Sequence, residues 1–438
     1  MKINKNFCFL LLLLLSIIQL VGCKSSDDFN GIPYNPSKPV ELTSFYPDSG
    51  KYLEKVILTG SNFGTNPDSL RVYFNSKKAA VVGTNGNEMY VLAPRLPGDT
   101  CIISVAIGKD SLAYSNIFRY QKSVTVSTIA GNGSDGEIVT GGLSQTVIEP
   151  RYLCCDKDDN LFICSRGEYD ESGSFGILRL DEENDELIML DKNVTGNVPC
   201  ADPTTGIISI PTETSVGSFI SLNPGEFWAP RMRQMKWSDT DNQPANAWKH
   251  CMVVNPTDGY IYTLYYGGNL VKVNPVSYEV TPLMKISQGD NYGMTFSPLH
   301  PNLLYLSFWD NANENANSIC TVDVTDPTNT FQRISSPNIA GGFRDGKISE
   351  AQFHDPAEMF CDNDGNIYVA DYNNQCIRRI TTDNMVETVL GIPGQSGWQD
   401  GTKEEALFYH PRGIAINSEG AVYVADSGNC RIRKLTIN

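Results

Sequence analysis

The sequence predicts an all-β chain in which a small β-sandwich precedes a six-bladed β-propeller. Three observations support this prediction. Residues 39–121 alternate apolar and polar side chains over short runs, a motif recurs through the rest of the chain, and 37 Gly, 24 Pro and 20 Tyr in 438 residues are typical of a turn-rich globular protein. We therefore divide the chain into a leader at 1–22, a tether at 23–38, a sandwich at 39–121 and a propeller at 122–438.

The chain is strongly acidic. It has 34 Lys and Arg against 50 Asp and Glu, a formal net charge of −16. Such a surface repels phosphate backbones, so we expect no nucleic-acid partner. Neutral and cationic ligands remain open.

The leader has the pattern of an export signal. Lys2 and Lys5 precede an apolar run from Phe7 to Ile18 that is too short to be read as a spanning helix. The following Leu20-Val21-Gly22-Cys23 resembles the bacterial lipobox, which implies lipidation of the Cys23 thiol. Each buried acyl CH₂ contributes about 0.8 kcal/mol, so we expect attachment to the membrane by lipid alone.

The tether is polar and contains prolines. Its first residues, Lys24-Ser25-Ser26-Asp27-Asp28, resemble the surface-export signal of Bacteroidota lipoproteins. That resemblance implies a location on the cell outer membrane, facing the extracellular side. The later Asn35-Pro36-Ser37-Lys38-Pro39 favours an extended linker without a core of its own.

The sandwich is predicted from runs such as Lys55–Thr59 and Arg71–Phe74, which have the alternation of half-buried strands. The stretches Ser44–Gly50, Leu58–Gly64 and Val91–Pro94 resemble the immunoglobulin-like IPT/TIG family. The segment contains neither Trp nor His, so we interpret it as a spacer or docking module.

The propeller is predicted from an internal repeat. Ile367–Ile380 overlays Val422–Leu435 at an offset of 55 residues, and the same offset carries Asp345-Gly346 onto Asp400-Gly401. This motif resembles the NHL repeat, which forms one blade of a propeller.

The remaining blades are predicted from spacing. Pro150 and Asp158-Asp159-Asn160 lie 206 residues before the equivalent positions of the clear copy, Asp258-Gly259 and Asn302–Leu306 mark two more blades, and another is inferred near 200–240. The chain ends one strand short of a sixth blade. We expect Val124–Gly131 to supply that strand and close the ring, which removes exposed sheet edges.

Aromatic residues gather in the predicted loops between blades and between the second and third strands of a blade, which emerge on one face. Flat rings stack on the C–H faces of sugars, and adjacent amides, carboxylates and arginines bond the hydroxyls. A long insertion from Asn223 to Trp248 is expected at the same rim. The alternative, that these side chains only pin the loops, stays open. The candidate glycan-binding residues are Trp309, Trp398, Tyr372, Tyr266, Trp228, Trp237, Trp248 and Arg344.

Two other residue sets suggest sites but favour a structural interpretation. The set Asp371, Asn374 and Arg378 recurs 55 residues later, as expected for Asp and Asn satisfying turn amides and Arg pairing with neighbours. The stretch Asp362–Asn366 resembles the start of a calcium loop, but its twelfth position is Asn373, where a bidentate Glu is needed.

The chain has four histidines, at positions 250, 300, 354 and 410. A zinc lyase of peptidylglycine type shares the six-bladed NHL architecture and binds metal through His from several blades. Here His250 aligns with Pro356, whereas His354 lies two residues before that proline, so the histidines occupy different slots. We therefore predict no catalytic residues, metal or cofactor, and zinc-dependent lyase chemistry is a lesser alternative.

The order of lipobox, IPT/TIG segment and NHL propeller resembles the surface lipoproteins of Bacteroidota polysaccharide-utilisation systems. The resemblance implies a non-enzymatic protein that holds a polysaccharide or oligosaccharide. Its partners would be an outer-membrane TonB-dependent importer and the binding lipoprotein of that importer. The alternative function is a protein–protein adaptor or adhesion component of the import complex.

Overall fold

The computed structural model describes residues 31–95, 98, 100–122, 124–165, 175–192, 194–238 and 243–437. The predicted leader and Cys23 lie outside the described residues. The chain divides into two compact units, one ending at Lys122 and the other running from Ser123 to Ile437. Within the described ranges, no helix combines the length and apolar character needed to cross a bilayer.

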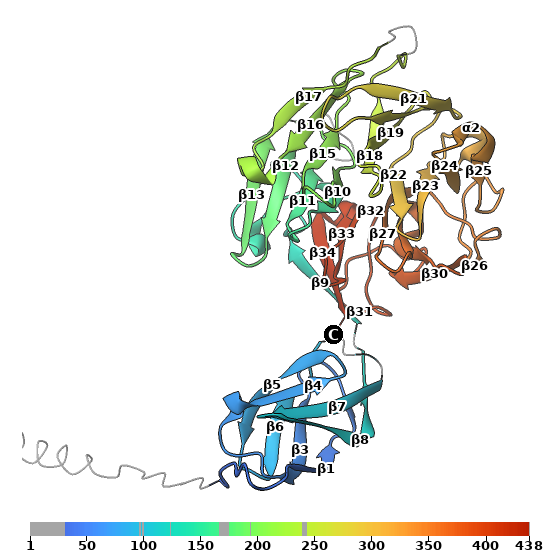
Figure 1. Cartoon of the computed structure of the whole chain (residues 1–438). Coiled ribbons are helices and arrows are strands. Elements are labelled where there is room, and N and C mark those ends of the chain that lie inside the picture. The colour runs from blue at the N-terminus through green and yellow to red at the C-terminus, as the bar shows by residue number, and fades with distance from the viewer. Residues whose placement is uncertain are drawn as a thin grey trace, which may run out of the picture. The chain divides into compact units, whose positions relative to one another are not determined.

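The first unit is a β-sandwich (Figure 1). Strand β5 pairs with β6 on one side and with β4 on the other, so that one continuous sheet folds over a common core, in the order β1-β3-β6-β5-β4-β7-β8-β2. The elements are β1 (Glu41–Tyr46), β2 (Ser49–Gly50), β3 (Lys55–Ser61), η1 (Pro67–Ser69), β4 (Leu70–Phe74), β5 (Lys77–Thr84), β6 (Glu88–Leu92), β7 (Thr100–Ile107) and β8 (Asp110–Tyr120).

The core of the sandwich follows from strand alternation. Val56 and Leu58 point inward from β3 and are completely buried, and Phe74 meets Phe118 edge-on at 5.1 Å between ring centroids. The sandwich predicted from the sequence is therefore confirmed.

The second unit is a propeller, and its described residues form six blades of antiparallel strands, numbered here in chain order (Figure 1). Blade 1 is β10 (Pro150–Cys155), β11 (Leu161–Ser165), β12 (Gly176–Asp181) and β13 (Glu186–Lys192); blade 2 is β14 (Cys200–Ala201), β15 (Ile208–Pro211), β16 (Ser218–Leu222) and β17 (Arg231–Gln234); blade 3 is β18 (Lys249–Val254), β19 (Ile261–Tyr265), β20 (Asn269–Val273) and β21 (Val280–Lys285).

Blades 4 to 6 follow in the same pattern. Blade 4 is β22 (Gly293–Ser297), β23 (His300–Phe308), β24 (Ser318–Asp323) and β25 (Gln332–Arg333); blade 5 is β27 (Pro356–Cys361), β28 (Ile367–Asp371), β29 (Cys376–Ile380) and β30 (Met385–Leu390), with β26 (Gly346–Lys347) at its outer edge; blade 6 is β32 (Pro411–Ile416), β33 (Val422–Asp426), β34 (Arg431–Ile437) and β9 (Val124–Ala130), with β31 (Gly401–Thr402). The short helices are η2 (Leu143–Gln145), η3 (Pro224–Glu226), η5 (Asn313–Asn315), α2 (Pro327–Thr330), η6 (Tyr372–Asn374) and η7 (Ser427–Asn429).

The ring closes as predicted, because β9 pairs with β34 and completes blade 6. Gly391 and Gly131 follow the outer strands of blades 5 and 6 and have φ values of +83° and +90°. A Cβ on Gly131 would lie 2.3 Å from the carbonyl oxygen of Cys430, so only glycine fits this close approach. The six-bladed fold, including the blade inferred near 200–240, is confirmed.

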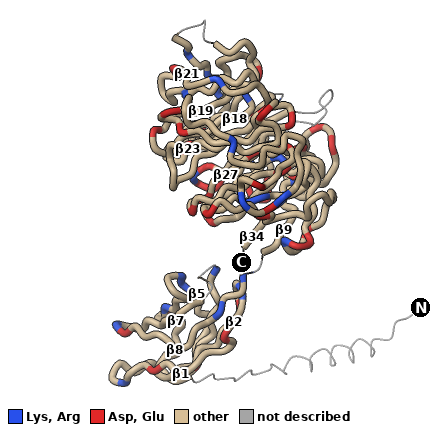
Figure 2. The backbone as a smooth tube through the Cα atoms, turned by 90° about the vertical axis from the view of Figure 1, so that its right-hand side faces the viewer, with Lys and Arg blue, Asp and Glu red and all other residues tan. Residues whose placement is uncertain are grey.

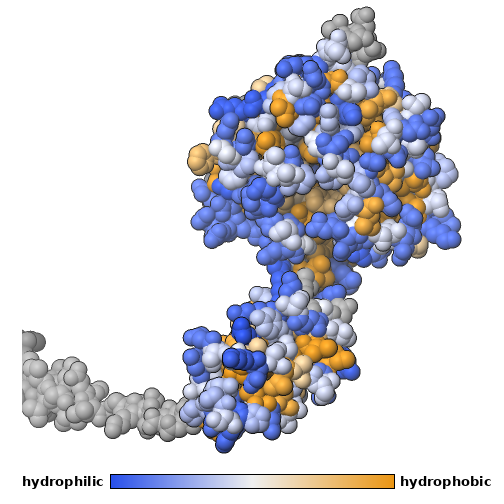
Figure 3. All heavy atoms as spheres, in the orientation of Figure 1, coloured by the Kyte–Doolittle hydropathy of each residue, from blue (hydrophilic) through white to orange (hydrophobic). Residues whose placement is uncertain are grey.

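The repeated Asp, Asn and Arg residues form a buried network in each of the last two blades. Arg378 is fully buried, and its Nη1 donates to Oδ2 of Asp371 at 2.7 Å while its Nη2 donates to Oδ1 of Asp345 at 2.6 Å. Arg433 makes the same bonds to Asp426 and Asp400, both at 2.7 Å. The structural interpretation of this motif is confirmed. Hydrophilic side chains cover most of the propeller surface visible in Figure 3.

Candidate functional site

The strand pattern of the propeller separates two faces. Each inner strand begins at one face and ends in a hairpin at the other, so that the connections between the second and third strands emerge beside the start of the inner strands. We call the face at which the inner strands begin the long-loop face. The face at which they end in a hairpin is the hairpin face.

A β-bulge marks the start of the inner strand in several blades. In blade 3, Lys249 pairs with Tyr265 and Cys251 with Leu264, which leaves His250 as the extra residue. Arg412 is the extra residue of blade 6, between Pro411 and Gly413. The strand register corrects the alignment made from the sequence, because Lys249 rather than His250 holds the slot of Pro356. The hairpin from Val254 to Ile261 is one residue longer than its counterpart from Cys361 to Ile367.

Aromatic side chains from blades 3 to 6 form a continuous row on the long-loop face, which we call the aromatic arc. Its members come from the connections before the inner strands, from those after the second strands and, for His250, from the β-bulge in β18. Successive ring centroids are 5.3 Å apart for Trp248–Tyr266, 6.5 Å for Tyr266–His250, 4.6 Å for His250–Tyr292, 4.9 Å for Tyr292–Trp309, 5.2 Å for Trp309–Tyr372, 4.3 Å for Tyr372–His410 and 4.2 Å for His410–Tyr409.

Arg412 lies against the inner side of this arc and is only 4% exposed. Its Cζ is 4.7 Å from the ring centroid of Trp309, 4.8 Å from that of Tyr292 and 5.6 Å from that of Tyr372. Its Nε donates to the hydroxyl of Tyr152 at 3.1 Å. A desolvated cation over several ring faces fixes the rings in place.

Carboxylates line the arc. His250 has a carboxylate oxygen near each ring nitrogen, since Oε1 of Glu213 is 3.4 Å from Nε2 and Oδ1 of Asp290 is 3.2 Å from Nδ1. Beside the middle of the arc, Asp355 accepts from the backbone N–H of Asp310 at 3.0 Å and from the side-chain amide of Asn373. Burial raises the pKa of Asp355.

Exposure along the arc divides its members into two groups. Trp248 is 49% and Tyr409 39% exposed, and Trp309 is half-buried, so these rings present surface to solvent. His250 and Tyr372 are each 6% exposed and support their neighbours. Nε1 of Trp309 is buried and has no hydrogen-bond partner among the described residues. The arc can therefore stack on a flat apolar face and bond polar groups beside it.

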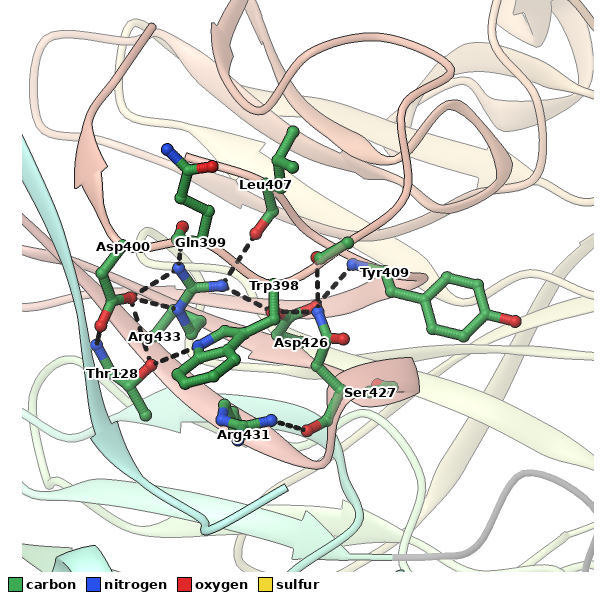
Figure 4. Close-up of polar contacts among 12 residues, drawn as sticks. Thr128, Trp398, Gln399, Asp400, Leu407, Tyr409, Asp426, Ser427, Arg431 and Arg433 are labelled. Atoms are coloured by element: carbon green, nitrogen blue, oxygen red, sulfur yellow. Dashed lines mark hydrogen bonds and ion pairs between the residues drawn. The ribbon is translucent and has the colours of Figure 1, made fainter. Parts of the chain in front are cut away.

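The structure brings together four of the eight predicted binding residues, namely Trp248, Tyr266, Trp309 and Tyr372. Trp398 lies elsewhere, on the outer part of blade 6 (Figure 4). Its Nε1 donates to Oγ1 of Thr128 at 3.0 Å, and Cζ of Arg431 is 3.9 Å from its ring centroid.

Arg344 and Trp237 also lie apart from the arc. Nη2 of Arg344 bonds Oε2 of Glu350 at 2.8 Å, and both side chains are more than half exposed. Trp237 is half-buried and packs against Tyr265 at 6.2 Å between centroids.

Trp228 was expected at the same rim, and this expectation is wrong. The segment from Asn223 to Trp248 contains β17, and Trp228 lies in the connection before that strand, which emerges at the hairpin face. Its ring is 6.0 Å from that of Phe162, and Cζ of Arg179 is 4.9 Å from its centroid. Strand β17 was missed because its sequence, Arg-Met-Arg-Gln, lacks apolar alternation.

The sequence interpretation missed Tyr292 and Tyr409 as binding residues, and it weighed His250 and His410 only as metal ligands. A signal for them exists. Trp248, Tyr292 and His410 each lie immediately before the first residue of an inner strand, at Lys249, Gly293 and Pro411. An aromatic residue recurring at that position predicts a cluster around the channel mouth.

A cavity of about 600 Å³ opens in the propeller at the hairpin face, lined by inner strands and hairpin turns. Glu358 lies in its lining and is 3% exposed, and its Oε2 accepts from the backbone N–H groups of Leu153 at 3.0 Å and Ile414 at 3.1 Å. Burial raises the pKa of Glu358 well above its ordinary value. No residue of the aromatic arc lines this cavity, and the described residues contain no cluster of three or more His, Cys, Asp or Glu suited to a metal.

Comparison with known families identifies both units. The IPT/TIG domain pattern matches residues 39–121, and the NHL repeat pattern matches residues 408–435. The chain thus combines an IPT/TIG domain with a six-bladed NHL-type propeller. Among curated proteins, it is 33% identical over 97 residues to the Arabidopsis thaliana protein SUPPRESSOR OF QUENCHING 1, chloroplastic, and 29% identical over 92 residues to human NHL repeat-containing protein 3. It spans only 9% and 25% of the length of these two relatives.

Solved structures from Bacteroides share the fold of nearly the whole chain. A protein of unknown function from Bacteroides thetaiotaomicron has a TM-score of 0.70 and 23% identity, covering 93% of this chain and 100% of that one. An auxiliary nutrient binding protein from the same species has a TM-score of 0.61, 21% identity and coverage of 92% and 99%. An auxiliary nutrient binding protein from Bacteroides ovatus has a TM-score of 0.65, 19% identity and coverage of 93% and 100%.

Proposed function

We propose that this chain is a cell-surface lipoprotein that binds a polysaccharide without catalysis, through the aromatic arc of its propeller. The bound glycan is held for import as a nutrient. Continuity of the arc is the observation that carries the proposal. The rings from Trp248 to Tyr409 form one row with carboxylates beside it, and Trp248, Trp309 and Tyr409 present surface to solvent.

The chemistry of the arc suits a sugar. Ring faces are electron-rich and attract the C–H groups of a pyranose face, whereas the carboxylates of Glu213 and Asp290 accept hydrogen bonds from hydroxyls. Two similarly folded proteins named auxiliary nutrient binding proteins support a nutrient as the ligand class.

The location and the partners are part of the same proposal. Lipidation at Cys23 would hold the chain on the outer membrane, and the acidic residues after it would direct it to the extracellular side. The partners would be a TonB-dependent importer and its binding lipoprotein. Support comes from the lipobox-like sequence and from the order of the two units.

Affinity electrophoresis of the full chain in gels containing single polysaccharides, followed by calorimetry on those that retard it, tests the proposal. Galactomannan, xyloglucan, laminarin, inulin and starch are suitable first probes. Trp248→Ala and Tyr409→Ala remove exposed rings of the arc and are expected to weaken binding about tenfold each, equivalent to about 1.4 kcal/mol. Trp398→Ala is the matched control, because Trp398 is exposed yet lies outside the arc.

Retardation that survives both arc variants, or that is lost with Trp398→Ala alone, would place the site elsewhere. Failure of the chain to bind any polysaccharide, together with recovery of the importer in a pull-down, would favour the adaptor function instead.

A further inference from the structure

We infer that the aromatic arc selects by charge, accepting neutral glycan chains and excluding polyanionic ones such as uronic-acid polymers. This inference rests on the proposed function. It is drawn from the charged groups that surround the arc rather than from the rings themselves.

Acidic side chains gather at the long-loop face, beside the part of the arc that blades 3 to 5 contribute. They lie in the connections after the second strands and immediately before the inner strands, which are the segments that form the long-loop face. In the described parts of these segments the acidic residues are Glu149, Glu213, Asp290, Asp310, Glu314 and Asp355. Asp310 and Glu314 are exposed, in the same connection as Trp309. Figure 2 shows Asp and Glu in many loops of the propeller.

Basic side chains do not balance these acids. The described residues of the connections after the second strands, and the four residues before each inner strand, include neither Lys nor Arg. Lys249 lies at the start of an inner strand but is fully buried, and its Nζ donates to the carbonyl oxygens of Thr212 at 2.6 Å and Ser215 at 2.8 Å. Arg412 is 4% exposed behind the rings. Arg151, the extra residue of the β-bulge in blade 1, is half-buried near Tyr292, so three basic side chains stand against six acidic ones at this face.

The carboxylates nearest the rings are held in place. Nδ2 of Asn311 donates to Oδ2 of Asp290 at 2.7 Å, and the backbone N–H of Asp290 donates to Oδ1 of Asn311 at 2.9 Å. These bonds, together with Nδ1 of His250 at 3.2 Å from Oδ1, hold the Asp290 carboxylate beside the rings. A fixed negative charge near the ring surface repels a sugar carboxylate over a Debye length, which is about 10 Å at 0.1 M salt.

Like charges brought together in this way oppose binding, and the opposition weakens as salt screens it. A neutral pyranose meets no such electrostatic repulsion, since it carries no charge and its hydroxyls donate hydrogen bonds to carboxylates. The arc therefore discriminates against an anionic polymer through repulsion, although its rings would stack equally well on either sugar.

The experiment compares derivatives of one polysaccharide. The neutral polymer that the full chain binds is oxidised at its primary hydroxyls to carboxylates, and part of that product is then methyl-esterified, which removes the charge without restoring the hydroxyl. Calorimetry at 20 mM NaCl is expected to show the carboxylated form binding about tenfold more weakly than the ester, and the gap is expected to narrow at 0.5 M NaCl.

Paired variants assign the effect to this face. The double variant Asp310→Asn with Glu314→Gln neutralises two exposed acids next to Trp309. It is expected to reduce the ratio of the two dissociation constants, carboxylated polymer to ester, about threefold. The control pair, Glu183→Gln with Asp364→Asn, neutralises two exposed acids in turns of the hairpin face and should leave the gap unchanged.

Equal binding of the carboxylated polymer and its ester at low salt would overturn the inference while leaving the proposed function intact. The inference would also be overturned if the difference in affinity between the two polymers changed neither with salt nor with the Asp310→Asn and Glu314→Gln substitutions. If no polysaccharide of any charge binds, the proposed function and the inference both fail.

Discussion

The guanidinium of Arg412 lies 4.7 Å from the ring centroid of Trp309, with its charge against the inner side of the aromatic arc. The same group is within 5.6 Å of the centroids of Tyr152, Tyr292 and Tyr372. One buried side chain at a β-bulge thus contacts rings from blades 1, 4 and 5. We therefore expect the arrangement of the arc to depend on this residue, although Arg412 itself is too buried to meet a ligand.

Replacing Arg412 with Met keeps an unbranched apolar stem but removes the guanidinium and its charge. Each desolvated cation–π contact contributes up to about 2 kcal/mol, so we expect Arg412→Met to lower the free energy of unfolding by about 2 kcal/mol or more and to weaken polysaccharide binding. Urea unfolding and calorimetry measure the two effects. Arg431→Met is the control, because Arg431 packs on Trp398 outside the arc and its loss should leave binding unchanged. Unaltered binding by Arg412→Met would show that the rings hold their positions without it.

Glu358 joins three blades, because this residue of β27 accepts hydrogen bonds from β10 and β32. We expect Glu358→Gln to be nearly as stable as the wild type, since the amide oxygen can accept from both N–H groups. Glu358→Ala leaves those two N–H groups unpaired at a cost of about 1–3 kcal/mol each, so it is expected to unfold at lower urea. Denaturant unfolding of the two variants side by side provides the measurement. Equal stability of the two variants would mean that water replaces the carboxylate in the cavity.

The fold was accessible from the sequence because its repeat is explicit in the last two blades. The 55-residue offset carries Asp345, Asp371 and Arg378 onto a second buried network, and the same bonds recur in both copies. Blade 2 was predicted only by spacing, because strands such as β17 lack alternation.

The site was only partly predictable. Trp309 and Tyr372 follow second strands, whose ends meet near the channel mouth in every blade, so position along the chain was informative. Trp398 lies in a long connection between blades that also pairs with the outer strand, and its place depends on Thr128, which is 270 residues away in the sequence. Such contacts are created by ring closure and cannot be read from local pattern.

Lipidation at Cys23 predicts a clear cellular result. In cells that express the chain, Cys23→Ala is expected to abolish incorporation of labelled palmitate and to move the protein from the membrane fraction to the soluble fraction, since several acyl chains are needed for stable attachment. Cys8→Ala, which changes the cysteine of the leader, is the control and should leave labelling intact. Labelling that persists without Cys23 would show that the lipobox resemblance is misleading.

Asp426 provides a test of the buried network through pH. Its carboxylate is fully buried, accepting from Nη1 of Arg433 at 2.7 Å and from the backbone N–H of Tyr409 at 2.8 Å. Burial outweighs the attraction of Arg433 and raises the pKa of Asp426 from 3.8 to about 6. A raised pKa in the folded state means that the native chain binds the proton more tightly than the unfolded chain. The stability that Asp426 contributes is therefore fully present below pH 3.8 and is lost as pH rises through about 6.

Asp426→Asn removes this titration, so the difference in unfolding free energy between wild type and variant isolates it. We expect that difference, wild type minus variant, to fall by an amount on the order of 2 kcal/mol between pH 4.5 and pH 7.5. Urea unfolding of both proteins at the two pH values gives the measurement. Glu183→Gln, at an exposed position, is the control and should show little change. A difference that rises with pH would mean that the ion pair with Arg433 outweighs burial, and that Asp426 is ionised throughout this range.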